Sequence, residues 1–260
     1  MIAKIAGEAL ARLPLPSLTI VIPAYDEAER ITNTLVQVHA FALQALDSFE
    51  ILVVNDGSRD GTADVVRAFA IGHPGVHLLE NDRNRGKGFT VRHGALAARF
   101  DYVLFTDADN STPIEELEKL AAVATPRSLV IASRGLADSR LEVPQPWYRS
   151  VMGHAFRRIV QGLVVPGIQD TQCGFKLFGR EVVQAVFTDL QVEGFAFDVE
   201  AIARSMRLGF DVFEVPVRWI DDRRSRVSPF RDSARMFRDV VKIWWRLRGL
   251  APASPSSARQ

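Results

Sequence analysis

The sequence predicts an α/β fold with a mostly parallel central sheet, followed by a C-terminal amphipathic helix. Short apolar runs alternate with longer stretches of helical spacing from residue 18 to residue 133. Strands that alternate with helices form parallel sheets whose two faces are covered by the helices. Polar clusters follow three of the runs, at 25–27, 55–60 and 107–111, and such sheets bind ligands beyond the carboxyl ends of their strands.

The elements of the first half follow from this pattern. Apolar runs bounded by polar or turn residues are the predicted strands: Leu18–Pro23, Phe49–Asn55, Val76–Leu79, Tyr102–Thr106 and Leu129–Ser133. Stretches with apolar residues at helical spacing are the predicted helices: Glu27–Leu46, Gly61–Ala70 and Phe89–Arg99. A further helix is expected to open at Thr112 and Pro113, with threonine as N-cap and proline at the first helical position.

The second half is less regular. We expect a turn at Pro144–Trp147 that leads into a helix ending near Gln161, a polar loop over Gly167–Phe178, a helix over Phe197–Met206 and a strand over Val212–Trp219. The predicted organisation is a tail over 1–17, one domain over 18–231, the amphipathic helix over 232–249 and a disordered tail over 250–260, rich in Ala, Ser and Pro.

Composition narrows the class of protein. A chain of 260 residues that is 47% hydrophobic suits one large domain or two small ones. The single cysteine, Cys173, rules out an internal disulfide framework and fits a reducing compartment. No apolar stretch reaches the roughly 18 residues that span a bilayer, and no signal peptide is recognisable. These features predict a cytoplasmic protein.

Charge is distributed unevenly along the chain. Residues 218–260 hold 11 Lys or Arg against 4 Asp or Glu, whereas residues 1–217 hold 21 against 27. A basic end predicts an anionic partner, which is a nucleic acid, a phosphate-bearing substrate or a membrane surface.

The most informative motif is Asp107-Ala108-Asp109, which ends an apolar strand with two carboxylates and no adjacent basic residue. Hard divalent cations prefer carboxylate and phosphate oxygens. The motif therefore predicts a metal at the strand end that faces an anionic ligand. The alternative is a turn that enters a helix, where aspartate is also common.

Two other strand ends carry groups suited to a ligand. Tyr25 offers an aromatic face and Glu27 an acceptor, while Asp56 is placed to accept hydrogen bonds from a ligand amide or hydroxyl. Lys87, in Arg-Gly-Lys-Gly before a helix, is a candidate phosphate contact. The alternatives are a glycine-rich turn and a solvated loop. The sequence lacks a Walker loop, a Gly-x-Gly-x-x-Gly after the first strand, metal-ligand spacing of histidines and a hydrolase elbow.

Together these motifs resemble a known family. The segments that carry the resemblance are Pro23-x-Tyr-x-Glu27, Val54–Thr62, Arg85–Gly88, Asp107–Asp109, Ala132–Arg134, Gln169–Lys176, Gly194–Glu200, Glu214–Trp219 and Arg224–Val227. They are similar to the inverting nucleotide-sugar glycosyltransferases of the GT-A fold, and most similar to the dolichyl-phosphate (polyprenyl-phosphate) β-glucosyltransferase branch. The resemblance covers about residues 18–248 and implies a single GT-A, Rossmann-like domain.

The resemblance implies roles for the residues at the strand ends. The nucleotide sugar is expected to contact Pro23, Ala24, Tyr25, Glu27, Val54, Asp56, Lys87, Asp107 and Ala108. Asp109 is expected to bind Mg²⁺ or Mn²⁺ directly, with Asp107 beside it. Relatives often carry glutamine where this chain has Ser111, so a serine hydroxyl or a water would replace that ligand. The expected catalytic residues are Asp109, Arg134 and Asp198, although Asp198 also suits a helix N-cap.

The acceptor decides whether a general base is needed. A lipid phosphate has a second pKa near about 6 and is already anionic at pH 7, so it needs positioning by arginine forks rather than deprotonation. The candidate residues are Arg134, Arg149, Lys176, Arg224 and Arg226. For Arg149 and Arg226 the alternative is an ordinary surface charge. A single displacement inverts an α-linked donor to a β-linked product.

The C-terminal helix has the composition of a membrane-surface helix. Its basic stripe is Arg235, Arg238, Lys242 and Arg246, and its apolar face is Met236, Val240, Ile243, Trp244 and Leu247, widened by Phe237, Val241 and Trp245. Such a helix suits a membrane interface, and the alternative is a helix packed on the domain. We expect a protein peripherally associated with the inner face of the membrane.

The leading hypothesis is transfer of glucose from UDP-glucose to a polyprenyl phosphate. A second one is another transferase, which uses GDP-mannose or a hydroxyl acceptor in polysaccharide synthesis. A third is a non-catalytic module whose basic tail binds nucleic acid or membrane. The intact Asp107, Asp109 and Lys87 argue against the third hypothesis, so no nucleic-acid partner is expected.

Overall fold

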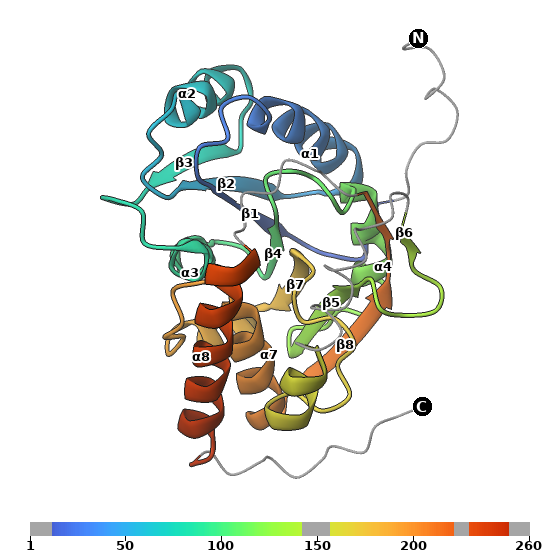
Figure 1. Cartoon of the computed structure of the whole chain (residues 1–260). Helices are drawn as coiled ribbons and strands as arrows, with labels where there is room; N and C mark the ends of the chain where they lie inside the picture. The colour runs from blue at the N-terminus through green and yellow to red at the C-terminus, as the bar shows by residue number, and fades with distance from the viewer. Residues whose placement is uncertain (1–11, 142–156, 221–228, 250–260) are drawn as a thin grey trace.

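The structure is a computed structural model that describes residues 12–141, 157–220 and 229–249 (Figure 1). Its main sheet has seven strands in the order β3-β2-β1-β4-β7-β5-β8. The strands are β1 Leu18–Ala24, β2 Phe49–Asn55, β3 Val76–Glu80, β4 Tyr102–Thr106, β5 Ser128–Ser133, β7 Phe175–Gly179 and β8 Asp211–Pro216. Only β7 runs antiparallel to its neighbours β4 and β5. The predicted α/β class with a mostly parallel sheet is confirmed.

Helices cover both faces of this sheet. The helical elements are α1 Ile31–Ala45, α2 Thr62–Gly72, α3 Lys87–Ala97, η1 Ile114–Glu116, α4 Leu117–Ala121, α6 Arg180–Val182, η2 Val183–Phe187, α7 Phe197–Arg207 and α8 Pro229–Leu247. Residues 157–163 are also helical. A two-stranded pairing of β6 Arg140–Leu141 with β9 Arg218–Trp219 lies outside the main sheet.

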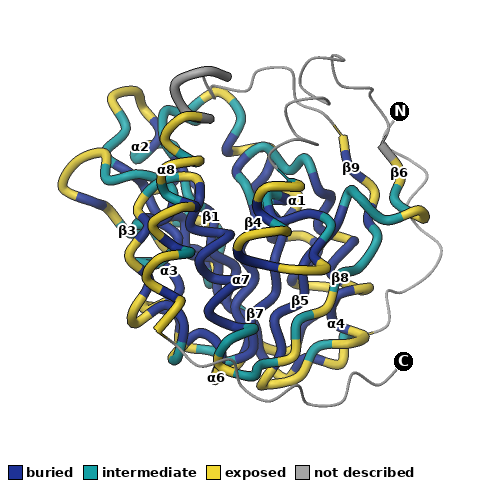
Figure 2. The backbone as a smooth tube through the Cα atoms, turned by 60° about the horizontal axis from the view of Figure 1, so that its bottom comes forward, coloured by how far each residue is buried: buried dark blue, intermediate teal, exposed yellow. Residues whose placement is uncertain are grey.

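The core is divided into two layers by the sheet. In β1, Ile20 and Ile22 belong to the layer with α1, α2 and α4, whereas Val21 belongs to the layer with α3, α7 and α8. Successive side chains of a strand point to opposite faces, so one strand supplies both layers. Figure 2 shows the strands as the buried centre, with exposed positions on the outer sides of the helices.

Register brings the carboxyl ends of the parallel strands to one edge. Ala24 of β1 pairs with Asn55 of β2, and Val21 pairs with Phe105 of β4. The segments that follow these strands therefore lie side by side, as the sequence predicts. This edge of the sheet holds the candidate site.

Two predictions about local structure were wrong. The expected polar loop over Gly167–Phe178 ends in β7, which is buried throughout and lies at the centre of the sheet. Thr112 is not an N-cap: Pro113 is the residue before the short η1 turn, and no side chain caps it. The hydroxyl of Thr112 instead lies 3.6 Å from the sulfur of Cys173.

The structure bears on the domain boundaries predicted near the two ends of the chain. Leu15 is 2% exposed and the amide of Leu13 donates to the carbonyl of Ala45, so residues before β1 pack on the end of α1. α8 crosses the predicted boundary between residues 231 and 232. The turn predicted at 144–147, the start of the helix that follows it and the tail at 250–260 lie outside the described residues.

Candidate functional site

A cleft of about 610 Å³ opens at the carboxyl edge of β1, β2 and β4. All but one of the residues predicted to contact the nucleotide sugar line it, and so does the predicted metal ligand Asp109: the contacts are Pro23, Ala24, Tyr25, Glu27, Asp56, Lys87, Asp107 and Ala108. Val54 is fully buried beneath them, against Gly94 of α3. The structure thus brings together side chains that come from three separate strand ends.

The loops after β1 and β2 are tied to each other by hydrogen bonds. The amide of Asp26, a residue with positive φ, donates to the hydroxyl of Ser58 at 2.9 Å. The amide of Arg59 donates to the carboxylate of Asp26 at 2.7 Å. Glu27 forms a close ion pair with Arg30, which also lines the cleft. This end of the cleft is therefore built before a ligand arrives.

Asp56 is the centre of a second network. Its carboxylate is 3% exposed and accepts hydrogen bonds from the amides of Arg85 and Gly86, at 2.8 and 2.9 Å. The side-chain amide of Asn81 donates to it as well, at 2.8 Å. Asp56 thereby fixes the loop that starts α3 at Lys87.

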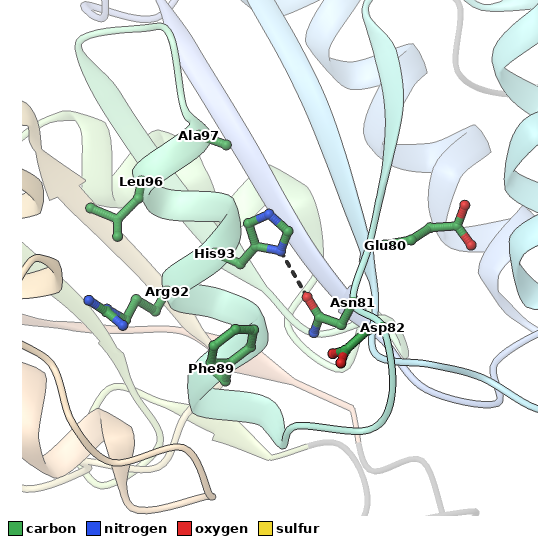
Figure 3. A pocket seen from close by; sticks show the side chains of 8 residues that line it. All are labelled: Glu80, Asn81, Asp82, Phe89, Arg92, His93, Leu96 and Ala97. Carbon is green, nitrogen blue, oxygen red and sulfur yellow. Dashed lines mark hydrogen bonds between the residues drawn. The ribbon is translucent and has the colours of Figure 1, made fainter.

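Sequence reasoning missed two residues of this network. His93 of α3 points toward Asn81, and its Nδ1 lies 2.8 Å from the Asn81 carbonyl oxygen (Figure 3). The two line a separate hollow on the outer side of α3. An isolated asparagine and an isolated histidine carry no sequence signal, because their partners come from other elements.

The paired carboxylates lie at the base of the cleft. Lys87 Nζ is 2.7 Å from Asp107 Oδ1, and Asp109 Oδ1 accepts a hydrogen bond from the amide of Ser111 at 2.9 Å. Burial, and then the charge of Asp107, raises the pKa of Asp109. Burial lowers the pKa of Lys87, but the neighbouring carboxylates, Asp107 first, outweigh it and the net pKa is raised. Lys87 is therefore a cation held among carboxylates.

The donor set fits a hard divalent cation that binds together with a phosphate ligand. Asp107 and Asp109 supply two carboxylates, and Ser111 follows two positions later. Within the described residues, no group of three or more His, Cys, Asp or Glu side chains is placed to hold a metal ion. Magnesium sites often use one or two carboxylates and take their remaining ligands from substrate phosphates and water.

Lys176 and Asp198 occupy different places from those predicted. Lys176 is fully buried, 2.7 Å from Asp198 Oδ1, and its Nζ donates to the carbonyl of Cys173 at 2.5 Å. It does not line the cleft, so its prediction as an acceptor-phosphate ligand needs correction. Asp198 is not an N-cap, since α7 begins at Phe197 after Ala196. Burial raises the pKa of Asp198 against the lowering by Lys176.

Arg134 forms an ion pair with the buried Asp170 and is itself partly exposed. Its Nε and Nη2 donate to the two carboxylate oxygens of Asp170, at 2.7 and 3.0 Å. Burial raises the pKa of Asp170, but Arg134 outweighs this and lowers it to about 2. The guanidinium also lies over Trp219, at 5.2 Å. The other predicted phosphate ligands, Arg149, Arg224 and Arg226, lie outside the described residues.

One wall of the cleft comes from elements that sequence reasoning did not place there. Arg235, Met236 and Asp239 of α8 line it together with Phe195. Helical periodicity assigns Arg235 and Met236 to the faces of a helix, but it does not say which face meets another element.

Comparisons with known proteins agree with the geometry. The model of glycosyl transferase family 2 matches residues 19–187. A dolichyl-phosphate beta-glucosyltransferase of Dictyostelium discoideum is 35% identical over 242 residues, which is 88% of this chain and 74% of that protein. The human protein of the same name is 32% identical over 254 residues, 92% of this chain and 78% of its own length.

Solved structures share the fold. Glucosyl-3-phosphoglycerate synthase from Mycobacterium tuberculosis, with Mn²⁺, UDP and glucosyl-3-phosphoglycerate, superposes with a TM-score of 0.67 at 19% identity, covering 92% of this chain and 82% of that one. A Pyrobaculum calidifontis mannosyltransferase with GDP-Man and Mn²⁺ gives a TM-score of 0.58 at 21% identity, with 85% and 60% covered.

Replacing Gly174 by alanine is expected to impair the site while the fold is kept. A Cβ at Gly174 would lie 1.9 Å from Asp107 Oδ2. Because the clash is with the end of a side chain, the carboxylate shifts rather than the backbone. A misplacement of about 1 Å costs on the order of 10²-fold in rate, so kcat/KM for sugar transfer falls by that order and the melting temperature changes little. Gly162→Ala, whose Cβ would meet no atom within 4 Å, is the matched control; equal activity of the two variants contradicts the placement of Asp107.

The Arg134–Asp170 pair predicts a pH-dependent stability. The folded pKa of Asp170 is about 2, below the value of about 3.9 for an unfolded chain, so the stabilisation is present above about pH 4 and is lost as pH falls toward 2. Asp170→Asn is expected to lower the melting temperature at pH 7 because it leaves a partly buried arginine without its carboxylate. The difference from wild type should stay constant down to about pH 4 and shrink below it. Asp64→Asn, at an exposed ion pair, should show no such trend; a difference between Asp170→Asn and wild type that is independent of pH contradicts the assignment.

Proposed function

The chain belongs to glycosyl transferase family 2, and we propose that it transfers glucose from UDP-glucose to a dolichyl-type or other polyprenyl phosphate, with inversion. The names of the relatives, at 31–35% identity over most of this chain, support the sugar and the acceptor. The residues of the cleft support a nucleotide-sugar donor and an anionic acceptor, as follows.

The donor is proposed to lie along the edge of the sheet. Tyr25 and Asp56 hold the nucleoside, which places the diphosphate at the loop before α3 and beside Lys87. Asp109 and Asp107 hold Mg²⁺ or Mn²⁺, with the hydroxyl of Ser111 or a water as a further ligand. A divalent ion, when bound, neutralises the charge that develops on the departing diphosphate.

The observation that carries the choice of acceptor is that each cleft carboxylate has a partner within the described residues. Glu27 pairs with Arg30, Asp107 with Lys87, and Asp239 with Lys242 at 3.6 Å. Asp56 and Asp109 accept hydrogen bonds from backbone amides. Asp198, which would otherwise suit a base, is 3% exposed and ion-paired. This arrangement suits an acceptor that is already ionised, and a phosphate is such an acceptor at pH 7.

In the proposed reaction a phosphate oxygen of the lipid attacks the anomeric carbon. The new oxygen–carbon bond forms as the bond between that carbon and the UDP oxygen breaks, and the electron pair leaves on UDP. Attack from the opposite side inverts the centre. Arg149, Arg224 and Arg226 are proposed to position the acceptor phosphate, since arginine forks match phosphate oxygens. The predicted role of Arg134 in positioning this phosphate is not carried forward, because its fork is bound to Asp170 and the residue does not line the cleft.

A membrane surface is the proposed place of the reaction. Phe237, Val241 and Trp245 of α8 are 47%, 39% and 69% exposed and recur every fourth residue, so they form one ridge, the α8 ridge. Arg238, Lys242 and Arg246 are the basic residues that follow each of them by one position. Aromatic and basic side chains together suit a membrane interface. In the part of the chain that the structure describes, no helix has the length and hydropathy to cross a bilayer.

The proposal predicts which donor labels lipid. Radiolabelled UDP-glucose, GDP-mannose or UDP-N-acetylglucosamine is offered with polyprenyl phosphate, with and without Mg²⁺ or Mn²⁺, and the organic phase is counted. Label from UDP-glucose alone, dependent on metal, is expected. Label from GDP-mannose instead identifies the mannosyl alternative. Metal-dependent binding of UDP-glucose without lipid label from any donor overturns the phosphate acceptor and leaves the hydroxyl acceptor.

The α8 ridge predicts a separable membrane defect. Trp245→Ser is expected to lower binding to phosphatidylglycerol vesicles by about tenfold, because burial of a large apolar side chain contributes about 1.5–3 kcal/mol. Flotation measures the vesicle binding, and calorimetry should show unchanged UDP affinity. Ile71→Ser, at a site that is 89% exposed on α2, is the control. If the two variants float equally, the ridge is not the surface that binds the membrane.

A further inference from the structure

The ammonium of Lys87 is paired with Asp107, which is one of the two carboxylates expected to bind the metal. Its Nζ lies 2.7 Å from Asp107 Oδ1 and 5.2 Å from the centre of the Phe105 ring. The lysine is the first residue of α3, whose preceding loop is fixed by Asp56. On the other side, the amide of Asp107 donates to the carbonyl of Gly174 at 3.0 Å. Both partners of the ion pair are therefore held in place by backbone contacts.

The other ammonium near this strand end, that of Lys176, is paired with Asp198 at 2.7 Å, so Lys87 is the cation that a metal at Asp107 would meet. Lys176 Nζ lies 5.9 Å from the centre of the Phe105 ring. A divalent cation at Asp107 would be repelled by the ammonium of Lys87, because like charges at close range in a partly buried site interact strongly. A metal at Asp107 therefore competes with Lys87, and the described residues offer no third acidic ligand to offset this.

A bound diphosphate would remove two obstacles to metal binding, which are the competition from Lys87 and the lack of a third ligand. Its oxygens supply the ligands that the two carboxylates lack, and they are partners for an ammonium at a helix N-terminus. Lys87 then has an anion to bind in place of Asp107, and Asp107 can turn to the metal.

We propose that Lys87 is a built-in counter-ion that neutralises Asp107 until a nucleoside diphosphate arrives, so that metal and donor bind as a coupled pair. The inference rests on the proposed use of a nucleotide-sugar donor, and it concerns the order and coupling of binding rather than the sugar or the acceptor. Coupling is reciprocal: if UDP tightens Mn²⁺ binding by some factor, Mn²⁺ tightens UDP binding by the same factor.

The test uses Mn²⁺ binding by the full chain, measured from the electron paramagnetic resonance signal of free Mn²⁺, with and without UDP. Wild type is expected to bind Mn²⁺ weakly alone and at least about tenfold more tightly with saturating UDP. In Lys87→Met, which keeps the length of the side chain and removes its charge, Mn²⁺ alone should bind about tenfold more tightly than to wild type. The same variant should show weaker UDP binding and a smaller coupling factor.

Controls separate competition from misfolding. Lys119→Met removes a lysine that pairs with Glu116, and neither residue lines the cleft; this variant should behave as wild type. Adding Asp107→Asn to Lys87→Met should abolish the gain in Mn²⁺ affinity. Mn²⁺ alone should raise the melting temperature of Lys87→Met more than that of wild type, a result that an unfolded variant cannot give.

Two outcomes overturn the inference. One is unchanged or weaker Mn²⁺ binding by Lys87→Met in the absence of UDP, and the other is Mn²⁺ binding by wild type that UDP does not tighten. Neither readout involves lipid, so failure here leaves the proposed transfer reaction standing if lipid is labelled. Coupled binding of Mn²⁺ and UDP without lipid label overturns the acceptor and keeps the role of Lys87.

Discussion

The site depends on paired charges that alternate in sign around the end of β4. Lys176 pairs with Asp198 behind the cleft, and Lys87 pairs with Asp107 at its base. For the buried Lys176–Asp198 pair, removing one partner costs about 3–5 kcal/mol, because an uncompensated charge remains. The position of each carboxylate is therefore set by the element that carries its lysine.

This constraint explains why an antiparallel strand lies inside an otherwise parallel sheet. β7 enters between β4 and β5 and places Lys176 in the layer under the cleft, where α7 brings Asp198 to meet it. The same strand follows Gly174, whose missing side chain leaves room for the carboxylate of Asp107. The insertion thus supports the metal-binding end of the cleft from behind, as Asp56 supports the start of α3 at the nucleoside end.

Sequence could predict the elements whose signal is local. Phe49–Asn55 and Tyr102–Thr106 have the predicted bounds because each is an apolar run that polar residues terminate abruptly. β7 was not predicted because Lys176 interrupts its apolar pattern. The partner that allows this lysine to be buried is Asp198, which comes from the distant helix α7. Asn81 and His93 were missed for the same reason, since hydrogen bonds between separate elements leave no periodic pattern in the sequence.

The C-terminal helix shows most clearly what periodicity leaves undecided. Its predicted apolar face divides into two in the structure: Val240, Ile243 and Leu247 are buried in the core layer with α7, while the α8 ridge is exposed. The alternative of a helix packed on the domain thus holds for the buried face, whereas the membrane role of the exposed ridge stays a prediction. Packing also brings Arg235 and Met236 to the wall of the cleft.

A surface helix that packs on the domain has a consequence for the acceptor. The ridge cannot turn independently of the cleft, because the same helix lines the cleft and is anchored in the core by its buried face. If the ridge lies in a membrane interface, the height of the cleft opening above that interface is fixed as well. A phosphate on a lipid has a restricted reach above the membrane surface, whereas a hydroxyl on a growing polymer has none of this restriction. A rigid connection between ridge and cleft is therefore useful for a lipid-phosphate acceptor and of little use for a polymer, which is the structural reason to favour the lipid.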